Sequence, residues 1–291
     1  MKVLVLGADG QVGRELMTHP AGAGLSRTGY GRAGGDVTDL ATLQALFAAE
    51  RPDVAINVAA YTAVDRAEDD RDAAFAVNDR GAANVAKACA AADAVLIHVS
   101  TDFVFDGALG RPYREDDAPN PVSVYGASKN AGEEKVRGAL ARHLIVRTAW
   151  VFGAHGRNFV KTILGLCDTR DRLRVVADQR GMPTPARNLA GALLTLAQKT
   201  GDTPPWGTYH LAGAGDATWH ELATAVAARH PKAPPVDPIG DADYPTRARR
   251  PADSRLDCAA IADRFGVRLP PWREGLADVL DELLAGRGSG A

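Results

Sequence analysis

The sequence predicts an α/β fold with a doubly wound parallel sheet and a smaller mixed α/β part towards the C-terminus. Apolar strand-like runs alternate with helical segments up to residue 148, an order that is typical of parallel sheets. The first run, residues 2–6, leads directly into a glycine-rich loop and then a helix. That order is the context of a dinucleotide-binding turn, so the sheet is expected to be of the Rossmann type.

Composition and charge place the chain among ordinary globular proteins. Of its 291 residues, 46% are hydrophobic and 24% are charged, and the net charge is −2. This balance gives no electrostatic case for a nucleic-acid or membrane partner, and no apolar run approaches the length of a membrane span. Cys89, Cys167 and Cys258 are too widely spaced for a metal motif or a disulfide framework, which suits a cytoplasmic location.

The glycine-rich loop carries Gly7, Gly10 and Gly13 in the spacing GxxGxxG. Such glycines let the backbone approach a pyrophosphate, and the following helix supplies amide donors and a positive dipole. The second strand is predicted to end at Arg27, with Arg32 nearby. An arginine there accommodates a 2′-phosphate, so NADPH is the expected cofactor and NADH the alternative, although solvated loop charges would look the same.

Tyr125 and Lys129 lie four residues apart at the head of a predicted helix over residues 129–140, on one helix face. A lysine ammonium beside a phenol favours the phenolate, so the pKa of Tyr125 is expected to be lowered. Thr101 follows the strand predicted over residues 95–99, where open α/β sheets bind ligands. His98 lies inside that apolar strand and is expected to be a packed histidine rather than a catalytic one.

The segment 231–251 is rich in proline and arginine and is predicted to be a long binding loop. Its Arg247, Arg249 and Arg250 could bind a phosphate through guanidinium forks, or could be no more than a solvated basic loop.

Several blocks of sequence together resemble one family. They are GADGQVG, NVAAYTAVDRAE, STDFVFDG, YGASK, RTAWVFG, DQRGMPTPA and YPTRARRPADSRLD, in order from residue 7 to residue 257. They resemble the extended short-chain dehydrogenase/reductase superfamily and, within it, the dTDP-4-dehydrorhamnose reductase family. The resemblance implies NAD(P)H-dependent reduction of the C4 keto group of dTDP-4-dehydrorhamnose to dTDP-L-rhamnose.

The resemblance also implies residue roles. Tyr125 would protonate the C4 oxygen, Lys129 would bind the nicotinamide ribose, and Thr101 would hydrogen-bond the carbonyl oxygen. The implied cofactor-binding residues are Gly7, Gly10, Gln11, Val12, Gly13, Arg27, Asp36, Val37, Ala59, Ala60, Tyr61, Thr62, Val99, Tyr125 and Lys129. The implied substrate-binding residues are Thr101, Asp102, Phe103, Trp150, Asn158, Arg250 and Arg255.

The expected domain organisation follows from the same reading. Residues 1–156 and about 184–215 would form the dinucleotide-binding domain, and about 157–183 and 216–285 the sugar-nucleotide domain. Residues 286–291 are expected to be a disordered tail, and a homodimer is conceivable.

The sequence departs from the family pattern in three places, one of which covers two residues. Phe103 stands where tyrosine is common, and Arg247 follows Pro245-Thr246 where proline is usual. Arg187 and Asn188 stand where relatives often carry an acidic residue, which in some of them bridges a dimer through a divalent metal, so no metal is expected here.

Two alternatives stay open at this point. One is a sister dTDP-4-keto-6-deoxyhexose reductase of secondary metabolism. The other is a non-catalytic regulatory subunit similar to the methionine adenosyltransferase β subunit, against which the intact Thr101, Tyr125 and Lys129 argue.

Overall fold

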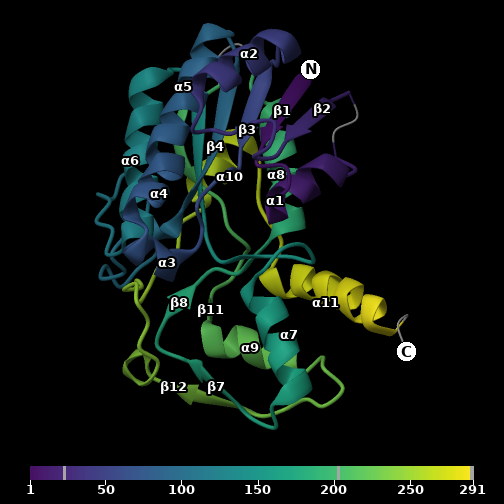
Figure 1. Cartoon of the computed structure of the whole chain (residues 1–291). Coiled ribbons are helices and arrows are strands. Elements are labelled where there is room, and N and C mark those ends of the chain that lie inside the picture. Colours follow the sequence, from purple (N-terminus) through teal and green to yellow (C-terminus); the bar gives the residue numbers. More distant parts are fainter. Residues whose placement is uncertain (22–23, 202–203, 289–291) are drawn as a thin grey trace.

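A six-stranded parallel sheet forms the larger part of the molecule (Figure 1). The computed structural model describes residues 1–21, 24–201 and 204–288. The strand order is β2 (Ser26–Tyr30), β1 (Lys2–Leu6), β3 (Val54–Asn57), β4 (Val95–Thr101), β5 (His143–Thr148) and β10 (Gly207–His210). The order reverses between β1 and β3, and the carboxyl ends of strands at such a switch point bind ligands in open α/β sheets.

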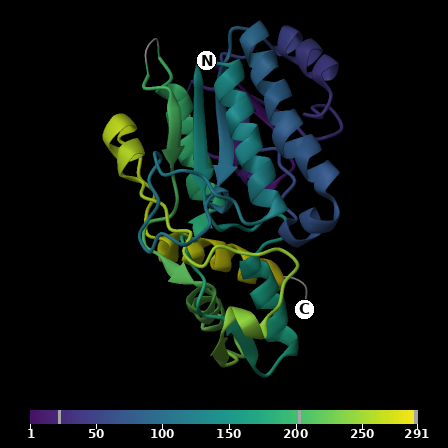
Figure 2. The ribbon, with the colours of Figure 1, turned by 90° about the vertical axis from the view of Figure 1, so that its left-hand side faces the viewer.

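Helices cover both faces of this sheet, as predicted. One face packs against α1 (Gln11–Thr18), α8 (Ala186–Gln198) and α10 (Ala259–Phe265), around an apolar core that includes Val5, Ile56 and Leu193. The other face packs against α2 (Leu40–Glu50), α5 (Ala82–Ala91) and α6 (Val124–Ala139), which lie side by side in Figure 2. The doubly wound Rossmann-type fold is therefore confirmed.

A smaller α/β region lies beyond the carboxyl ends of the strands (Figure 1). Its helices are α7 (Phe159–Thr169), α9 (Trp219–Ala227) and α11 (Trp272–Gly288), which enclose a separate apolar core. Three two-stranded pairs complete it: β7 (Leu173–Val176) with β12 (Val236–Ile239), β8 (Arg180–Gly181) with β11 (Ala217–Thr218), and β6 (Val151–Phe152) with β9 (Thr184–Pro185).

Three details of the predicted organisation need correction. The segment expected to be a structure-poor loop contains β12 and the short helix η3 (Asp241–Asp243). Helix α10, assigned to the sugar-nucleotide domain, packs instead on the large sheet, because Ile261 and Phe265 belong to its core. Helix α11 continues to Gly288 into the expected tail, and residues 289–291 lie outside the described residues.

Residues 71–91 form three consecutive helical pieces: α4 (Arg71–Phe75), a π-helical turn η1 (Ala76–Gly81) and α5. The remaining short helices are α3 (Val64–Asp69) and η2 (Asp102–Val104). A π-helical turn is uncommon and often marks a functional position. Within the described ranges, no helix is long and apolar enough to cross a membrane.

Candidate active site

Tyr125 and Thr101 meet at the carboxyl edge of the large sheet. Helix α6 begins at Val124, earlier than predicted, because the Ser123 hydroxyl caps it by accepting the N–H of Gly126 at 3.2 Å. Tyr125 therefore lies in the first turn of α6, and its hydroxyl is hydrogen-bonded to Thr101 at the end of β4. Gly126 permits this approach, since a Cβ there would lie 2.1 Å from the Phe103 carbonyl oxygen.

Lys129 follows one turn later, with its side chain buried between α6 and β4. Its Nζ donates to the Val99 carbonyl at 2.7 Å. Burial lowers the pKa of Lys129 to about 8, and the carboxylate of Glu133 opposes that shift. The Lys129 ammonium is therefore almost fully shielded from solvent and lies near the carboxyl end of β4.

The expected lowering of the Tyr125 pKa does not occur in the free protein. Burial raises the pKa of Tyr125 to about 12, and its hydrogen bond to Thr101 offsets this only in part. The charge of Asp102 acts in the same direction as burial. Tyr125 is consequently protonated at neutral pH and available as a proton donor.

Asp102 presents an unsatisfied oxygen to this site. The residue is buried, and its Oδ1 accepts the Thr101 hydroxyl at 3.0 Å. Its Oδ2 has no hydrogen-bond partner among the described residues. Burial raises the pKa of Asp102 to about 6, although the Ser254 and Thr101 hydroxyls near the carboxylate act in the opposite direction. A buried carboxylate oxygen without a donor is costly, so a ligand hydroxyl is a fitting partner here.

The glycine-rich loop leaves a helix N-terminus open beside the same edge. Gly7, at φ +86°, packs so closely that a Cβ would lie 2.6 Å from the Ala59 amide nitrogen. Gly10 precedes α1, and no side chain caps this helix. The first amides of α1, including those of Gln11 and Val12, are thus suited to an anionic group such as a pyrophosphate.

The wall next to this loop comes from β3 and η1. The side chain of Asn78 in η1 accepts the Tyr61 N–H at 2.8 Å and donates to the Tyr61 carbonyl at 3.0 Å. It also donates to Ser128 of α6 at 3.0 Å. Asn78 therefore fixes the 59–62 segment against the catalytic helix, a role that the sequence reading did not assign.

Arg27 is not where the sequence predicted it. Strand β2 begins at Ser26 rather than ending at Arg27, so Arg27 lies at the amino end of the strand. Its guanidinium donates to the carbonyls of Leu16 and His19, both at 2.7 Å. Arg32 follows the carboxyl end of β2 instead and lies 3.5 Å from Asp36. Of the two arginines, Arg32 is therefore the one beyond the carboxyl end of β2.

Asp36 and Val37 follow this turn and differ in their exposure. The Asp36 carboxylate accepts the N–H and hydroxyl of Thr38, which lowers its pKa. Val37 is buried in the core of the α2/α5/α6 face.

Of the predicted substrate residues described next, Trp150 packs against the smaller region, whereas Phe103 belongs to η2 beside β4. Trp150 has a left-handed backbone, φ +45°, and its ring stacks on Trp219 at 3.5 Å between centroids. A non-glycine residue in this conformation is strained, which is common at binding sites. The Phe103 ring meets Tyr125 edge-on at 5.7 Å.

The two arginines assigned to the substrate are each held by a carboxylate. Arg250 makes a two-point contact with Asp65 of α3, at 3.2 and 2.7 Å. Arg255 makes a similar contact with Asp253, at 2.8 and 2.6 Å. Asn158 caps α7 and donates to the Gln11 side chain at 2.8 Å, which ties the smaller region to the glycine loop.

Two further observations concern His98 and the arrangement of metal-ligating side chains. His98 is buried in β4 and hydrogen-bonded to Asn57 at 3.1 Å, as expected for a packed histidine. Among residues 1–21, 24–201 and 204–288, no group of three His, Cys, Asp or Glu side chains is arranged to hold a metal ion.

Comparison with known proteins decides the family. Residues 1–285 match the family described as the RmlD substrate binding domain. The chain belongs to this family. A dTDP-4-dehydrorhamnose reductase of Sinorhizobium fredii is 40% identical, with 98% of each chain covered.

Two solved structures of this family have nearly the same fold as this chain. A dTDP-4-dehydrorhamnose reductase of Clostridium acetobutylicum has a TM-score of 0.92 at 35% identity, covering 98% of this chain and 100% of that one. One from Bacillus anthracis, in complex with NADP, has a TM-score of 0.91 at 34% identity, covering 97% of this chain and 99% of that one. The resemblance read from the sequence blocks is confirmed.

Proposed function

We propose that the protein is an NADPH-dependent dTDP-4-dehydrorhamnose reductase, which reduces the C4 keto group of dTDP-4-dehydro-6-deoxy-L-mannose to give dTDP-L-rhamnose. Near-complete coverage by relatives of that name supports this proposal. The observation that carries it is the contact of the Tyr125 hydroxyl with Thr101, beside the unpartnered Asp102 oxygen. These groups suit a carbonyl and a neighbouring sugar hydroxyl.

The glycine loop fits a dinucleotide. Gly10, Gln11 and Val12 would hold the pyrophosphate with the uncapped amides of α1, and Arg32 would meet the 2′-phosphate. Asp36 and Val37 would lie at the adenosine end, and Ala60, Tyr61 and Thr62 further along. Bound NADPH supplies the hydride for C4.

Tyr125 donates the proton in this proposal. Its pKa of about 12 keeps it protonated at neutral pH, so it can give its hydroxyl proton to the C4 oxygen. Thr101 orients the same oxygen, and Asp102 accepts a sugar hydroxyl with Oδ2. Lys129 binds the ribose and, as a nearby cation, eases ionisation of Tyr125 when the site is occupied.

Arg250 and Arg255 bind the diphosphate of the sugar nucleotide. A guanidinium has five N–H donors, and a two-point contact with a carboxylate leaves others free. Asp65 and Asp253 therefore orient these arginines. Arg250 Nη1 also donates to Thr246 and to the Ala248 carbonyl, which leaves its Nε and one Nη2 proton for a phosphate. The stacked Trp150 supplies an apolar surface for the sugar.

A coupled assay tests the function. The dTDP-4-keto-L-sugar is generated enzymatically, the protein is added, and oxidation of NADPH and of NADH is followed separately. Cofactor oxidation with dTDP-L-rhamnose as product is expected, faster with NADPH. Absence of oxidation while the upstream enzymes are active would contradict the proposal.

Phe103 favours one second candidate, a sister dTDP-4-keto-6-deoxyhexose reductase. Its ring lies against Tyr125 at 5.7 Å, where a tyrosine would add a hydroxyl near the sugar. Turnover of several dTDP-4-keto sugars, compared in one assay, separates the two. The homodimer and the cytoplasmic location stay predictions, and light scattering tests the first.

A further inference from the structure

A buried ion pair lies directly behind the catalytic helix face. Glu133 follows Lys129 by one helical turn, and neither it nor Arg147 of β5 is more than 2% exposed. The Arg147 guanidinium contacts both Glu133 oxygens, with Nη2 to Oε2 at 2.7 Å and Nε to Oε1 at 2.9 Å. Ser100 donates to the same carboxylate at 2.5 Å. Burying such charges is costly unless they are paired, so each member of this cluster depends on the others to remain buried.

His210 connects this pair to the loop that carries Tyr113. It ends β10 and is fully buried, with Nε2 3.4 Å from Arg147 Nη1 and Nδ1 3.0 Å from the Tyr113 carbonyl oxygen. A guanidinium can only donate and a carbonyl can only accept. His210 must therefore be neutral, with its proton on Nδ1 and its Nε2 lone pair facing Arg147.

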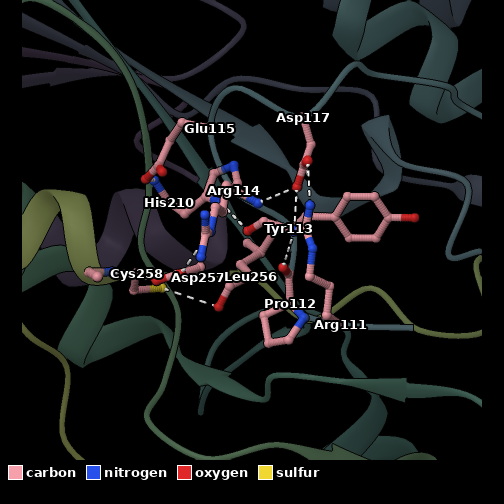
Figure 3. Close-up of polar contacts among 11 residues, drawn as sticks. Arg111, Pro112, Tyr113, Arg114, Glu115, Asp117, His210, Leu256, Asp257 and Cys258 are labelled. Carbon is pink, nitrogen blue, oxygen red and sulfur yellow. Dashed lines mark hydrogen bonds and ion pairs between the residues drawn. The ribbon is translucent and has the colours of Figure 1, made fainter. Parts of the chain in front are cut away.

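Tyr113 joins two segments through its main chain (Figure 3). Its carbonyl accepts both the His210 Nδ1–H and the Asp257 N–H, the latter at 2.7 Å. Its own N–H donates to the carbonyl of Arg255 at 2.7 Å. The His210 N–H in turn donates to Glu115 of the same loop at 2.9 Å. The backbone that carries Arg255 is thus held by Tyr113, and Tyr113 is held by His210.

We propose that Glu133, Arg147 and His210 are positioning residues for substrate binding. Through the Nδ1–H tautomer of His210, the ion pair behind Lys129 fixes the Tyr113 carbonyl and, with it, the main chain of Arg255. These contacts thereby fix the separation between helix α6 and the main chain of Arg255, the arginine that would bind the diphosphate. This inference rests on the proposed function, because it assigns Arg255 to the substrate diphosphate.

Two substitutions of His210 separate positioning from packing. In His210→Asn, the amide nitrogen takes the place of Nδ1 and can still donate to the Tyr113 carbonyl. In His210→Gln, the amide reaches the place of Nε2 and can meet only Arg147. We expect His210→Gln to raise the KM for the sugar nucleotide and the Kd for dTDP about tenfold, the value of one buried hydrogen bond. The kcat and the KM for NADPH should stay within about twofold, and His210→Asn should restore the sugar-nucleotide KM.

A spectroscopic measurement on the wild-type protein needs no variant. A two-bond ¹H–¹⁵N correlation spectrum, with the His210 signal assigned by its loss in His210→Asn, should show a neutral ring protonated at Nδ1. A ring protonated at Nε2, or an imidazolium, would overturn the inference, as would equal dTDP affinities in the two variants. If the wild-type protein failed to reduce the keto sugar while the two affinities still differed, the proposed function would be at fault and the positioning role would stand.

Discussion

The two sides of the active site are built in different ways. On the large sheet, Thr101, Tyr125 and Lys129 come from β4 and α6, and each is placed by the strand or helix that contains it. On the side of the smaller region, Arg250 is placed by Asp65, which belongs to a distant part of the chain. The comparison indicates that the reacting groups are set by local secondary structure, whereas Arg250 on the binding side is set by an ion pair between distant segments.

The largest expected effect is on the catalytic side. Tyr125→Phe should lower kcat by at least about a hundredfold, since general acid catalysis contributes that much or more, while NADPH affinity, measured by fluorescence, should be unchanged. The matched control is Tyr209→Phe, which removes a hydroxyl that donates to the carbonyl of Pro205, just before β10. Near-native turnover of Tyr125→Phe would refute the assignment of the acid.

The buried ion pair should dominate stability. Arg147→Met leaves the Glu133 carboxylate buried without its main partner, and we expect a loss of about 3–5 kcal/mol in the free energy of unfolding. Arg229→Met removes an exposed pair with Asp281 and should cost less than about 1 kcal/mol. Urea denaturation of both variants gives the comparison, and equal losses would mean that the buried pair has no special weight.

The binding side can be tested through the carboxylate that orients Arg250. Burial raises the pKa of Asp65, but the hydrogen bonds from Arg250 and Ala248 outweigh it, so the pKa is lowered overall and Asp65 is charged at neutral pH. Asp65→Asn should raise the KM for the sugar nucleotide about three- to tenfold with little change in kcat. Asp69→Asn, which loses only an exposed contact with Arg247, is the control. Steady-state kinetics in which kcat fell instead would place Asp65 on the catalytic side.

The smallest expected effect concerns cofactor choice. Arg32→Ala should reduce the preference for NADPH over NADH about five- to tenfold, because a charge-assisted contact with the 2′-phosphate is lost. Arg27→Ala should leave that preference unchanged, since Arg27 is occupied by the carbonyls of Leu16 and His19. The ratio of kcat/KM for the two cofactors is the measurement. A change in that ratio with Arg27→Ala alone would restore the original assignment.

Much of the fold and the catalytic side could be predicted because their signals are local. The alternation of strands and helices predicted the parallel sheet, and the position of Thr101 after an apolar strand predicted its place at the carboxyl edge. The spacing of Tyr125 and Lys129 predicted one helix face. In each case neighbouring residues in the sequence are also neighbours in space.

The misplaced or missed residues depend on contacts between distant segments. The polar sequence of β2 contains no apolar run to mark its bounds, so the predicted end of the strand falls at its actual start and Arg27 falls at the opposite edge from the one predicted. The pKa of Tyr125 rises because of burial, which the spacing of the motif does not reveal. The buried ion pair does leave a local signal: Arg147 interrupts an apolar strand, and a charge there implies a buried partner such as Glu133.

The most direct measurement follows the hydride itself. NADPH that carries deuterium at the transferring position is oxidised by the protein with the dTDP-4-keto-L-sugar, and the product is analysed by NMR. The account predicts dTDP-L-rhamnose with deuterium bound to C4 and one cofactor oxidised per sugar. Deuterium at another carbon, or a sugar left unreduced by active protein, would contradict it.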